Sequence, residues 1–528
     1  MISRILQRFY QFILYIFSDK RLSLLLLLPF FFLCSLSGQG NGNIIDSIYS
    51  RVLGEMRQIE VILPREYEAE RAQTYEVIYV LDGQYYREQI PFIYRWTVES
   101  GYMPQSILVI IPNTFIDGIN QRMRDFTPSR REAEEYPGVQ SGGADRFLGF
   151  LQNELDPYIN EHYRTNGSKT LIGSSLSGLL VVHAFFNQPD FFTSFVASDP
   201  SIWWDDQFVL NMPDKKLANC LQSACTFWVA GIEDTYEGMG IKKLDSLLQS
   251  VGDPRWKCRI YQNETHFSVQ HKAFYDGLRF SFLGYDAKMT LRFHPTGGIL
   301  EDGKSIGVHF FNVNPLLTTT YTTDGSVPTR SSMQLHKNDE LIIEKPTKVS
   351  IKTFGNRDAY NESRIADFKS GTAFSPMPDT KSESSASITY SYYRKDGDDF
   401  GKRNMTRQAS TTIDKKSEEI ELQKSRDEMV HRIESSFEIE REGYYVFGIT
   451  ARGGAKIFID GSKLIDYEKE GNDEQSFIVP LKLGTHSIAL ELTTIDMTDE
   501  IQFICFYAGY GTDDWWQSEP VQILPAFK

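Results

Sequence analysis

The sequence predicts an α/β domain built on a mostly parallel sheet, followed by two all-β sandwich domains. Apolar runs alternate with helical patterns between residues 41 and 285, and short strands and turns replace them after residue 286. This alternation is typical of parallel sheets flanked by helices. A chain of 528 residues also has room for about three domains, at ~150 residues each. The predicted boundaries are 1–40 for a signal peptide, 41–285 for the α/β domain, 286–371 for the first sandwich, 372–387 for a polar linker and 388–528 for the second sandwich.

The first 40 residues have the order of charges and apolar residues that a secretory signal requires. Basic residues precede an apolar run, Leu22–Cys34, and small residues follow it (Ser35, Ser37 and Gly38). This order predicts cleavage near Ser37–Gln39 and export to the periplasm, the cell surface or the medium. An uncleaved N-terminal membrane anchor and lipidation of Cys34 are the alternatives.

Charge and cysteine usage exclude several classes of function. The net charge of −15 argues against non-specific binding to nucleic acid and against adhesion to anionic membranes. Removal of the signal leaves Cys220, Cys225, Cys258 and Cys505, too few for a disulfide scaffold in a chain of this length, although a Cys220–Cys225 bridge is an alternative. The sequence contains no Cys-x-x-Cys and no His-Glu-x-x-His, so neither a metal site nor a cofactor is predicted.

The elements of the α/β domain follow from burial patterns. Continuous apolar runs are typical of strands that are buried on both faces, and an apolar spacing of three to four residues is typical of helices. Strands are predicted at Ile59–Leu63, Val77–Leu81, Ile107–Ile111, Lys169–Ile172, Ser194–Ala197, Thr226–Ala230 and Cys258–Tyr261. Helices are predicted at Phe147–Tyr158, Leu179–Phe186, Ile241–Val251 and Lys272–Phe282.

The C-terminal half shows the turn and strand signals of β domains. Asp324-Gly325 is a strong hairpin signal, and alternation of apolar and polar residues begins at Val349. Residues 400–435 are highly charged and are predicted to form an extended or loop-rich insertion. Further strands are predicted at Gly443–Gly448, Lys456–Gly461, His486–Leu492 and Ile501–Tyr507.

Residues 170–178, Thr-Leu-Ile-Gly-Ser-Ser-Leu-Ser-Gly, carry the strongest functional signal. Ser175 lies between a buried strand and an apolar helix, with Gly173 and Ser177 two positions away on either side. A nucleophile elbow needs small residues at both of these positions because its serine adopts a strained backbone. The pattern predicts that Ser175 is a catalytic nucleophile; an ordinary Ser/Gly-rich turn is the alternative.

A serine nucleophile needs a base and a carboxylate that orients this base. His266 follows the last predicted strand and is the preferred base, with His271 and the more internal His183 as alternatives. The loop after Thr226–Ala230 offers Asp234 as the acid, or its neighbour Glu233. Nucleophile, acid and base then occur in the chain order that is typical of α/β-type serine hydrolases.

Acyl transfer also needs amide donors for the developing oxyanion. The N–H of Leu176 directly follows the nucleophile at the start of a helix. The loop after Val77–Leu81 contains Gly83, which lets the backbone approach closely. We therefore predict the N–H of Gln84 as the second donor.

Several sequence blocks of the α/β region resemble the putative esterase family, which includes siderophore esterases, S-formylglutathione hydrolases, and feruloyl and acetylxylan esterases. These blocks are Val77–Gln84, Arg122–Pro128, Ser141–Leu148, the elbow itself, Ser198–Asp205 and Glu264–Val269. The resemblance implies an α/β-hydrolase fold and hydrolysis of carboxylic esters, with Ser175 as nucleophile and His266 as base. It also implies that Trp203, Trp204 and Tyr85 contact substrate. Ser177 stands where the family usually has Gly, and Asp199 where a Ser is common.

The β regions carry weaker resemblances. Residues 321–329 resemble the immunoglobulin-like module of chitobiase-type enzymes, and residues 443–448 and 456–460 resemble the protective-antigen-type β-sandwich. Such sandwiches accompany carbohydrate-active enzymes, which makes acylated glycans one expected substrate class. Siderophore-like small-molecule esters, which the esterase resemblance implies, are the other. The acidic pair through which some of these sandwiches bind calcium is absent at residues 450–454, which argues against calcium-dependent sugar binding; a spacer role is the alternative.

The leading hypothesis is therefore an exported serine esterase. The alternatives are a non-catalytic glycan-binding or surface protein on a hydrolase scaffold, and an acyltransferase that uses the same catalytic residues.

Overall fold

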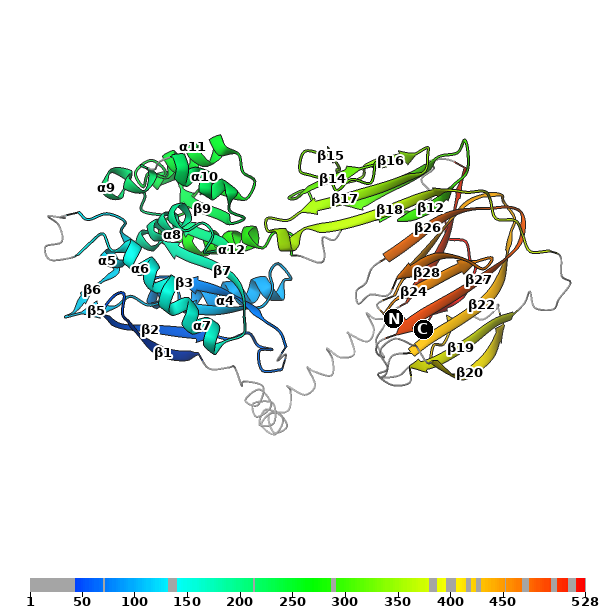
Figure 1. Cartoon of the computed structure of the whole chain (residues 1–528), viewed down its shortest axis with the longest axis horizontal. Coiled ribbons are helices and arrows are strands. Elements are labelled where there is room, and N and C mark those ends of the chain that lie inside the picture. Colours follow the sequence, from blue (N-terminus) through cyan, green and yellow to red (C-terminus); the bar gives the residue numbers. More distant parts are fainter. Residues whose placement is uncertain are drawn as a thin grey trace, which may run out of the picture. The chain divides into compact units, whose positions relative to one another are not determined.

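The computed structural model describes residues 43–69, 72–131, 140–211, 214–285, 291–378, 387–395, 405–414, 419–423, 429–451, 453–467, 474–494, 501–510 and 519–527. The chain divides into two compact units after Phe282 (Figure 1). The predicted signal peptide lies outside the described residues. Within the described ranges, no helix has the length and apolarity that a membrane span needs.

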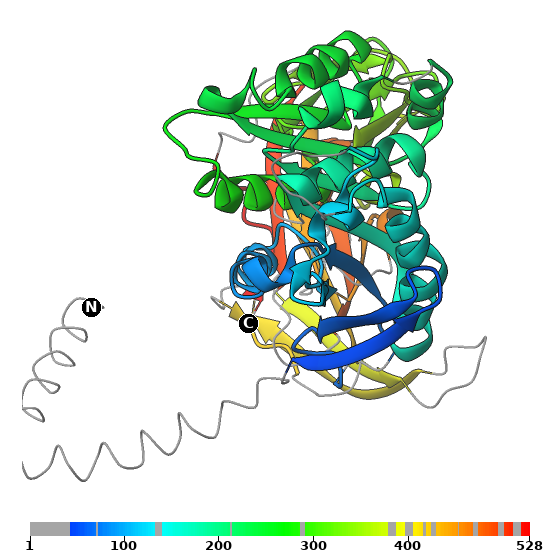
Figure 2. The ribbon, with the colours of Figure 1, turned by 90° about the vertical axis from the view of Figure 1, so that its left-hand side faces the viewer.

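The first unit contains an eight-stranded sheet in the order β1-β2-β4-β3-β7-β8-β9-β10. The antiparallel pair β1–β2 forms one edge, β2 pairs antiparallel with β4, and the remaining neighbours are parallel. Figure 2 shows this pair in dark blue. The strands are β1 Ile44–Ser50, β2 Glu55–Ile62, β3 Tyr75–Val80, β4 Ser106–Ile110, β7 Thr165–Ser174, β8 Ser194–Ser198, β9 Thr226–Ile232 and β10 Trp256–Tyr261. The predicted α/β class with a mostly parallel sheet is confirmed.

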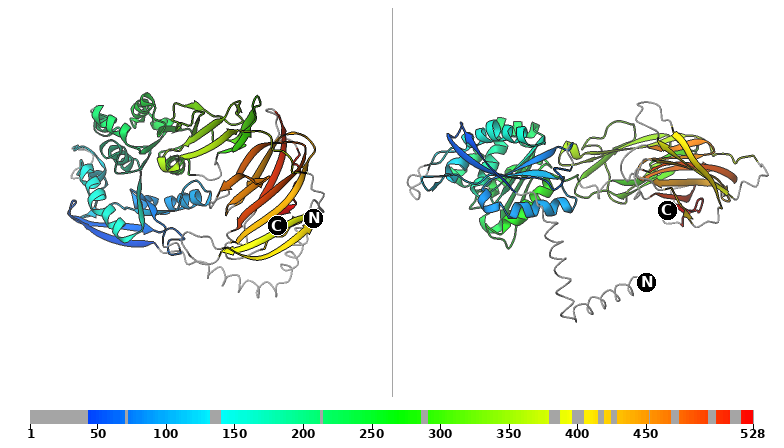
Figure 3. Two further views of the ribbon diagram at one scale, coloured as in Figure 1. Left: turned by 45° about the vertical axis from the view of Figure 1, so that its right-hand side comes forward. Right: turned by 90° about the horizontal axis from the view of Figure 1, so that it is seen from below.

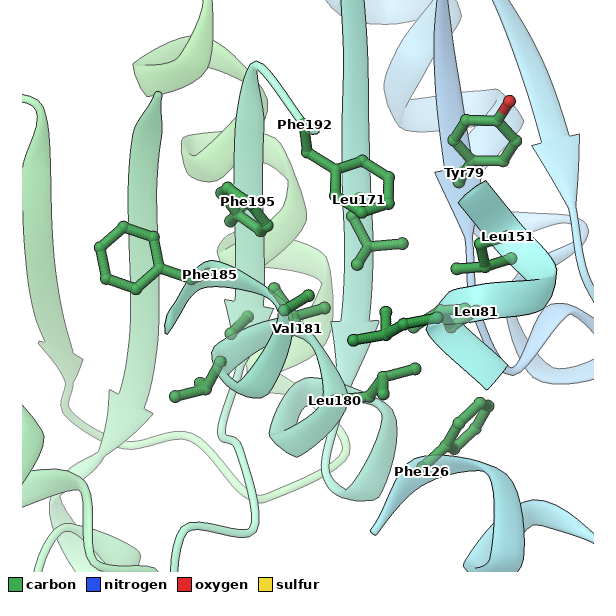
Figure 4. Packing of buried hydrophobic residues seen from close by; sticks show 14 of the residues in the cluster. Tyr79, Leu81, Phe126, Leu151, Leu171, Leu180, Val181, Phe185, Phe192 and Phe195 are labelled. Carbon is green, nitrogen blue, oxygen red and sulfur yellow. The ribbon is translucent and has the colours of Figure 1, made fainter. Parts of the chain in front are cut away.

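Helices cover both faces of this sheet. Successive residues of a strand point to opposite faces of the sheet. Phe195 of β8 contacts Phe185 of α8 (Leu176–Asn187) on one face. The next residue, Val196, lies against Gly277 of α12 (Val269–Ser281) on the other. Figure 4 shows the face beneath α8, where apolar side chains of the helix and the sheet interdigitate. This packing fixes the N-terminus of α8, and with it the nucleophile, against the end of β7.

The remaining helices of this unit are α3 Gly83–Tyr86, α4 Gln89–Glu99, α5 Arg122–Phe126, α6 Ala144–Phe150, α7 Asp156–His162, α9 Trp204–Gln207, α10 Asp214–Gln222 and α11 Ile241–Val251. The helix predicted at Phe147–Tyr158 spans the end of α6, a π-helical turn and the start of α7. A short hairpin, β5 Phe115–Ile116 and β6 Ile119–Asn120, turns at Asp117 and Gly118, both at positive φ.

The second unit is built from β-sheets. One sheet has three strands in the order β11-β13-β16, one has eight in the order β15-β14-β17-β18-β12-β26-β23-β28, and one has six in the order β20-β19-β22-β27-β24-β25. Figure 3 shows β22 and β27 of the six-stranded sheet side by side. The bounds are β11 Arg292–His294, β12 Gly297–Leu300, β13 Ile306–Asn312, β14 Thr318–Thr322, β15 Met333–Gln334, β16 Glu340–Ile343, β17 Thr347–Phe354, β18 Glu362–Ser370, β19 Ser387–Lys395, β20 Met405–Asp414, β22 Met429–Ile439, β23 Gly443–Thr450, β24 Ala455–Ile459, β25 Ser462–Tyr467, β26 Glu474–Leu481, β27 Gly484–Thr494 and β28 Gln502–Gly509.

The two β regions are not separate in this unit. β12, from the predicted first sandwich, pairs with β26 of the second at Gly298 and Ile478. Tyr444 and Val446 belong to the same apolar core as Leu300. Contacts therefore join residues on both sides of the predicted linker at 372–387. The charged segment predicted as an extended or loop-rich insertion contributes two long strands, β20 and β22.

Candidate active site

Ser175 occupies a sharp turn between β7 and α8. Its backbone lies at φ 59° and ψ −119°, a region that a side chain enters only at a cost of ~1–3 kcal/mol. A Cβ on Gly173 would lie 2.5 Å from the carbonyl oxygen of Ser177, so only glycine fits at that position. The strained serine and the obligatory glycine are the two marks of a nucleophile elbow.

Ser177, where the resembling family usually has Gly, takes part in this turn through its hydroxyl. The Ser177 Oγ donates to the Ser174 carbonyl at 2.8 Å and accepts the Ser174 N–H at 2.8 Å. The side chain is fully buried. The substitution therefore adds two hydrogen bonds across the elbow and leaves the position of the nucleophile intact.

The neighbouring strand β8 holds the nucleophile from the side. The N–H of Ser175 donates to the Ser198 carbonyl at 3.0 Å, and the N–H of Ser201 donates to the Ser175 carbonyl at 3.0 Å. The hydroxyl oxygens of Ser175 and Ser201 lie 3.4 Å apart. The residues that follow β8 are thus in direct contact with the predicted nucleophile.

His266 lies in the loop between β10 and α12 and is oriented by Asp199. Its Nδ1 lies 2.6 Å from Asp199 Oδ2, and the His266 side chain is 30% exposed whereas Asp199 is fully buried. Asp199 Oδ1 accepts a second hydrogen bond from the Thr235 hydroxyl at 2.8 Å, and its N–H donates to the Ala230 carbonyl at 2.7 Å. A buried carboxylate with these partners keeps the proton on Nδ1 and leaves Nε2 as the basic nitrogen.

This geometry corrects the predicted acid. Glu233 and Asp234 begin a short 3₁₀ turn after β9, and both side chains are exposed. The next residue, Thr235, points inward instead and donates to Asp199. The loop that was expected to supply the carboxylate therefore supplies a hydroxyl that holds it, while the carboxylate follows β8.

The two predicted oxyanion donors lie at the starts of two helices. Leu176 is the first residue of α8, and Gln84 is the second residue of α3. The first N–H groups of a helix have no carbonyl partner within that helix, so both amides are free of intrahelical bonds. A Cβ on Gly83 would lie 2.5 Å from the Ile110 side chain and 2.9 Å from the Ile111 carbonyl carbon. The close approach expected at Gly83 is present.

Among the predicted substrate contacts, Trp203 and Tyr85 are exposed at 42% and 64%, whereas Trp204 is only 2% exposed. Trp204 belongs to the main core, and its Nε1 donates to the Ser129 hydroxyl at 3.1 Å. Core packing thus accounts for the Trp204 ring, and its contact with substrate stays a prediction. Phe267, directly after His266, is 79% exposed and was not predicted.

Family models match two parts of this chain. Residues 50–229 match the model of the family described as putative esterase. This region therefore resembles the putative esterase family. Residues 365–489 match the PA14 domain model, so both the esterase resemblance and the protective-antigen-type resemblance are confirmed. The chitobiase-type resemblance stays a prediction.

The α/β region also resembles individual proteins. It is 32% identical over 153 residues to the ferri-bacillibactin esterase BesA of Bacillus subtilis, covering 26% of this chain and 52% of that protein. It is 30% identical over 166 residues to the siderophore triacetylfusarinine C esterase of Aspergillus fumigatus, covering 30% and 56%. The chain thus spans about half the length of these relatives. An IroE-like serine hydrolase from Shewanella oneidensis has a similar structure, with a TM-score of 0.40, 27% identity, and coverage of 46% of this chain and 80% of that one.

Groups of His, Cys, Asp and Glu that could hold a metal ion are absent from the described residues. Cys220 and Cys225 are buried free thiols, and burial raises their pKa values to about 12 and about 11. The alternative of a Cys220–Cys225 bridge is therefore not what the structure shows.

Proposed function

We propose that this protein is a serine hydrolase of carboxylic esters, with Ser175, His266 and Asp199 as its catalytic triad. The observation that carries this proposal is the strained Ser175 in contact with the β8 loop, whose carboxylate orients His266. The esterase family of the domain and the named activities of its relatives support the same reaction.

Each step of the reaction has a residue to perform it. Ser175 Oγ attacks the ester carbonyl while His266 Nε2 takes its proton, and Asp199 stabilises the imidazolium that forms. The N–H groups of Leu176 and Gln84 stabilise the tetrahedral oxyanion, each worth about 2.7–4 kcal/mol. The imidazolium then protonates the leaving alcohol, and a water molecule activated by His266 releases the acid from the acyl-enzyme.

Siderophore-like esters with aromatic groups are the proposed substrate class. Large exposed aromatic side chains lie on the segments that carry the site: Tyr85 beside Gln84 in α3, Trp203 after β8, and Phe267 beside His266. Exposed apolar surface at the mouth of a site is typical of ligand contact, and the relatives are named as siderophore esterases. Acylated glycans are the second class, favoured by the attached PA14 domain.

Export to the periplasm, the cell surface or the medium is part of the same proposal. It rests on the basic and apolar N-terminal residues of the sequence. An iron-chelating or glycan-linked ester would be met in those compartments.

The test is turnover of a substrate panel by the wild-type protein and by Ser175→Ala. The panel contains p-nitrophenyl acetate, a ferric catecholate triester, and acetylated and feruloylated xylan. We expect turnover that Ser175→Ala abolishes, and a kcat/KM for the catecholate triester above that for either xylan. Absence of turnover with every substrate would contradict the esterase proposal, and preference for a xylan would contradict the substrate class. Transfer of the acyl group to an added alcohol in place of water would identify an acyltransferase.

A further inference from the structure

Asp82 is a buried carboxylate that the proposed reaction does not use. It follows β3 and directly precedes Gly83 and Gln84, the segment that carries one oxyanion donor. Its side chain is fully buried, and its backbone lies in the left-handed region at φ 55°. A strained non-glycine residue persists only where its surroundings impose the conformation, so the partners of Asp82 show what imposes it.

Arg122, at the start of α5, binds Asp82 through two parallel hydrogen bonds. Arg122 Nε donates to Asp82 Oδ1 at 2.7 Å, and Arg122 Nη2 donates to Asp82 Oδ2 at 2.7 Å. Bidentate pairs of this kind fix orientation as well as distance. The pair therefore determines how the chain leaves β3 and where Gly83 and Gln84 lie.

The same guanidinium reaches the nucleophile elbow. Arg122 Nη2 lies 3.4 Å from the carbonyl oxygen of Ser174, one residue before the nucleophile and two before Leu176. One side chain thus contacts both segments that supply oxyanion donors: the Asp82 end of the β3 loop and the Ser174 end of β7. Arg122 therefore links the two segments on which the Gln84 and Leu176 amides lie.

Asn113, after β4, completes the arrangement from the other side. Its Nδ2 donates to Asp82 Oδ1 at 2.8 Å, and its backbone N–H donates to Gln84 Oε1 at 2.9 Å. Asp82 and Gln84 are therefore tied together by side-chain bonds in addition to the backbone. These contacts hold the Gln84 side chain and the Asp82 carboxylate, and so the segment that carries the Gln84 N–H.

We propose that the Arg122–Asp82 pair is a positioning device that sets the geometry of the oxyanion site. Neither residue touches the ester; both act through the peptides of Gln84 and Leu176. The inference rests on the proposed esterase function. It assigns a role to the Arg122–Pro128 block, of which the catalytic mechanism makes no use.

Arg124, two residues further along α5, is the matched comparison. It is also held in ion pairs, with Glu55 at 2.7 Å and Asp125 at 2.7 Å. Glu55 belongs to β2, at a distance from the elbow along the sheet order. Loss of Arg124 removes a comparable ion pair from the same helix without removing a contact to either oxyanion segment.

The experiment compares Arg122→Ala, Arg122→Lys, Asp82→Asn and Arg124→Ala in the full-length chain, with p-nitrophenyl acetate as substrate. A misplaced oxyanion donor lowers kcat by about 10–100-fold, and we expect this loss for Arg122→Ala with KM changed less than about threefold. Arg122→Lys should recover little because an ammonium cannot reproduce the two parallel bonds. Because the Arg122 side chain is 22% exposed, added guanidinium ion should restore part of the kcat of Arg122→Ala. Arg124→Ala should keep its kcat at 25 °C.

Several results would overturn this inference. One is an Arg122→Ala protein that folds and keeps its kcat. Another is an Arg122→Ala protein whose lost kcat guanidinium does not restore, while Arg124→Ala loses as much kcat and as much thermal stability. If Arg122→Ala does not fold, the comparison of Asp82→Asn with Arg124→Ala decides, and equal kcat values for those two would overturn the proposal. An inactive wild-type protein would contradict the esterase function itself, which separates the two failures.

Discussion

Replacement of Asp199 by Asn tests the origin of the triad carboxylate, the point on which sequence and structure disagree. The carboxylate is fully buried and lies 2.6 Å from His266 Nδ1, while its other oxygen accepts from Thr235 at 2.8 Å. In Asp199→Asn the amide oxygen stays with the Thr235 hydroxyl, and the NH₂ group then faces Nδ1. This arrangement favours the tautomer with its proton on Nε2, which cannot act as the base.

The expected loss combines this wrong tautomer with a lost counter-charge. In other serine hydrolases the same change lowers kcat by about 10⁴-fold, which corresponds to about 5.4 kcal/mol at about 1.36 kcal/mol per decade. We expect a decrease of about 10³–10⁴-fold in kcat for p-nitrophenyl acetate, with a thermal midpoint close to that of the wild type. Asp199→Asn preserves the size of the side chain, so a large loss of stability is not expected.

The controls are the two acids that the sequence favoured. Asp234→Asn and Glu233→Gln change exposed side chains and should each leave kcat within about twofold of wild type. The reasoning is refuted if Asp199→Asn keeps its kcat within tenfold while one of these two variants loses activity.

Three further predictions concern other parts of the chain. Gly83→Ala places a Cβ 2.5 Å from Ile110, and the displaced oxyanion loop should lower kcat by about tenfold or more; unchanged kcat would contradict the close approach. Phe185→Ala should lower the free energy of unfolding of the first unit, measured in urea, by about 3–5 kcal/mol, because the Phe185 ring is fully buried and stacks on Phe227 with the ring centroids 4.0 Å apart. Burial lowers the pKa of His431 to about 4. Between pH 6.5 and 4 the unfolded chain therefore binds more protons than the folded chain. As the pH falls through this window, the free energy of unfolding of the second unit should decrease by up to ~3 kcal/mol. His431→Gln should flatten this pH dependence in thermal unfolding, whereas the exposed control His336→Gln should not.

Local patterns predicted much of the fold. Continuous apolar runs located β3, β4, β8 and β9, and the strand–turn–helix pattern located the elbow, because each of these signals is contained in fewer than about 20 residues. The pairing of β12 with β26 joins residues that lie far apart in the chain. Neither periodicity nor turn chemistry carries information about such a contact, so the sequence suggested two separate sandwiches.

The site shows the same division between local and non-local information. The positions of Ser175 and His266 follow from the elements on either side of them, and the structure places both on the loops that were expected. The acid was assigned from chain order and loop position, which favoured Asp234. The choice between Asp234 and Asp199 depends on which side chain turns inward at the ends of two adjacent strands, β9 and β8. A signal was present: Asp199 stands where the family commonly has Ser, and a carboxylate buried beside the elbow needs a partner.

The central claim is that Ser175 is the nucleophile of an ester hydrolase, and covalent trapping tests it most directly. The full-length protein is treated with a fluorophosphonate, its intact mass is measured, and the modified residue is located by peptide sequencing in the mass spectrometer. The account predicts one adduct per chain, located on Ser175, formed in parallel with loss of p-nitrophenyl acetate turnover and absent from Ser175→Ala. An active protein whose adduct lies on another residue, or whose Ser175→Ala variant still hydrolyses the ester, would contradict it.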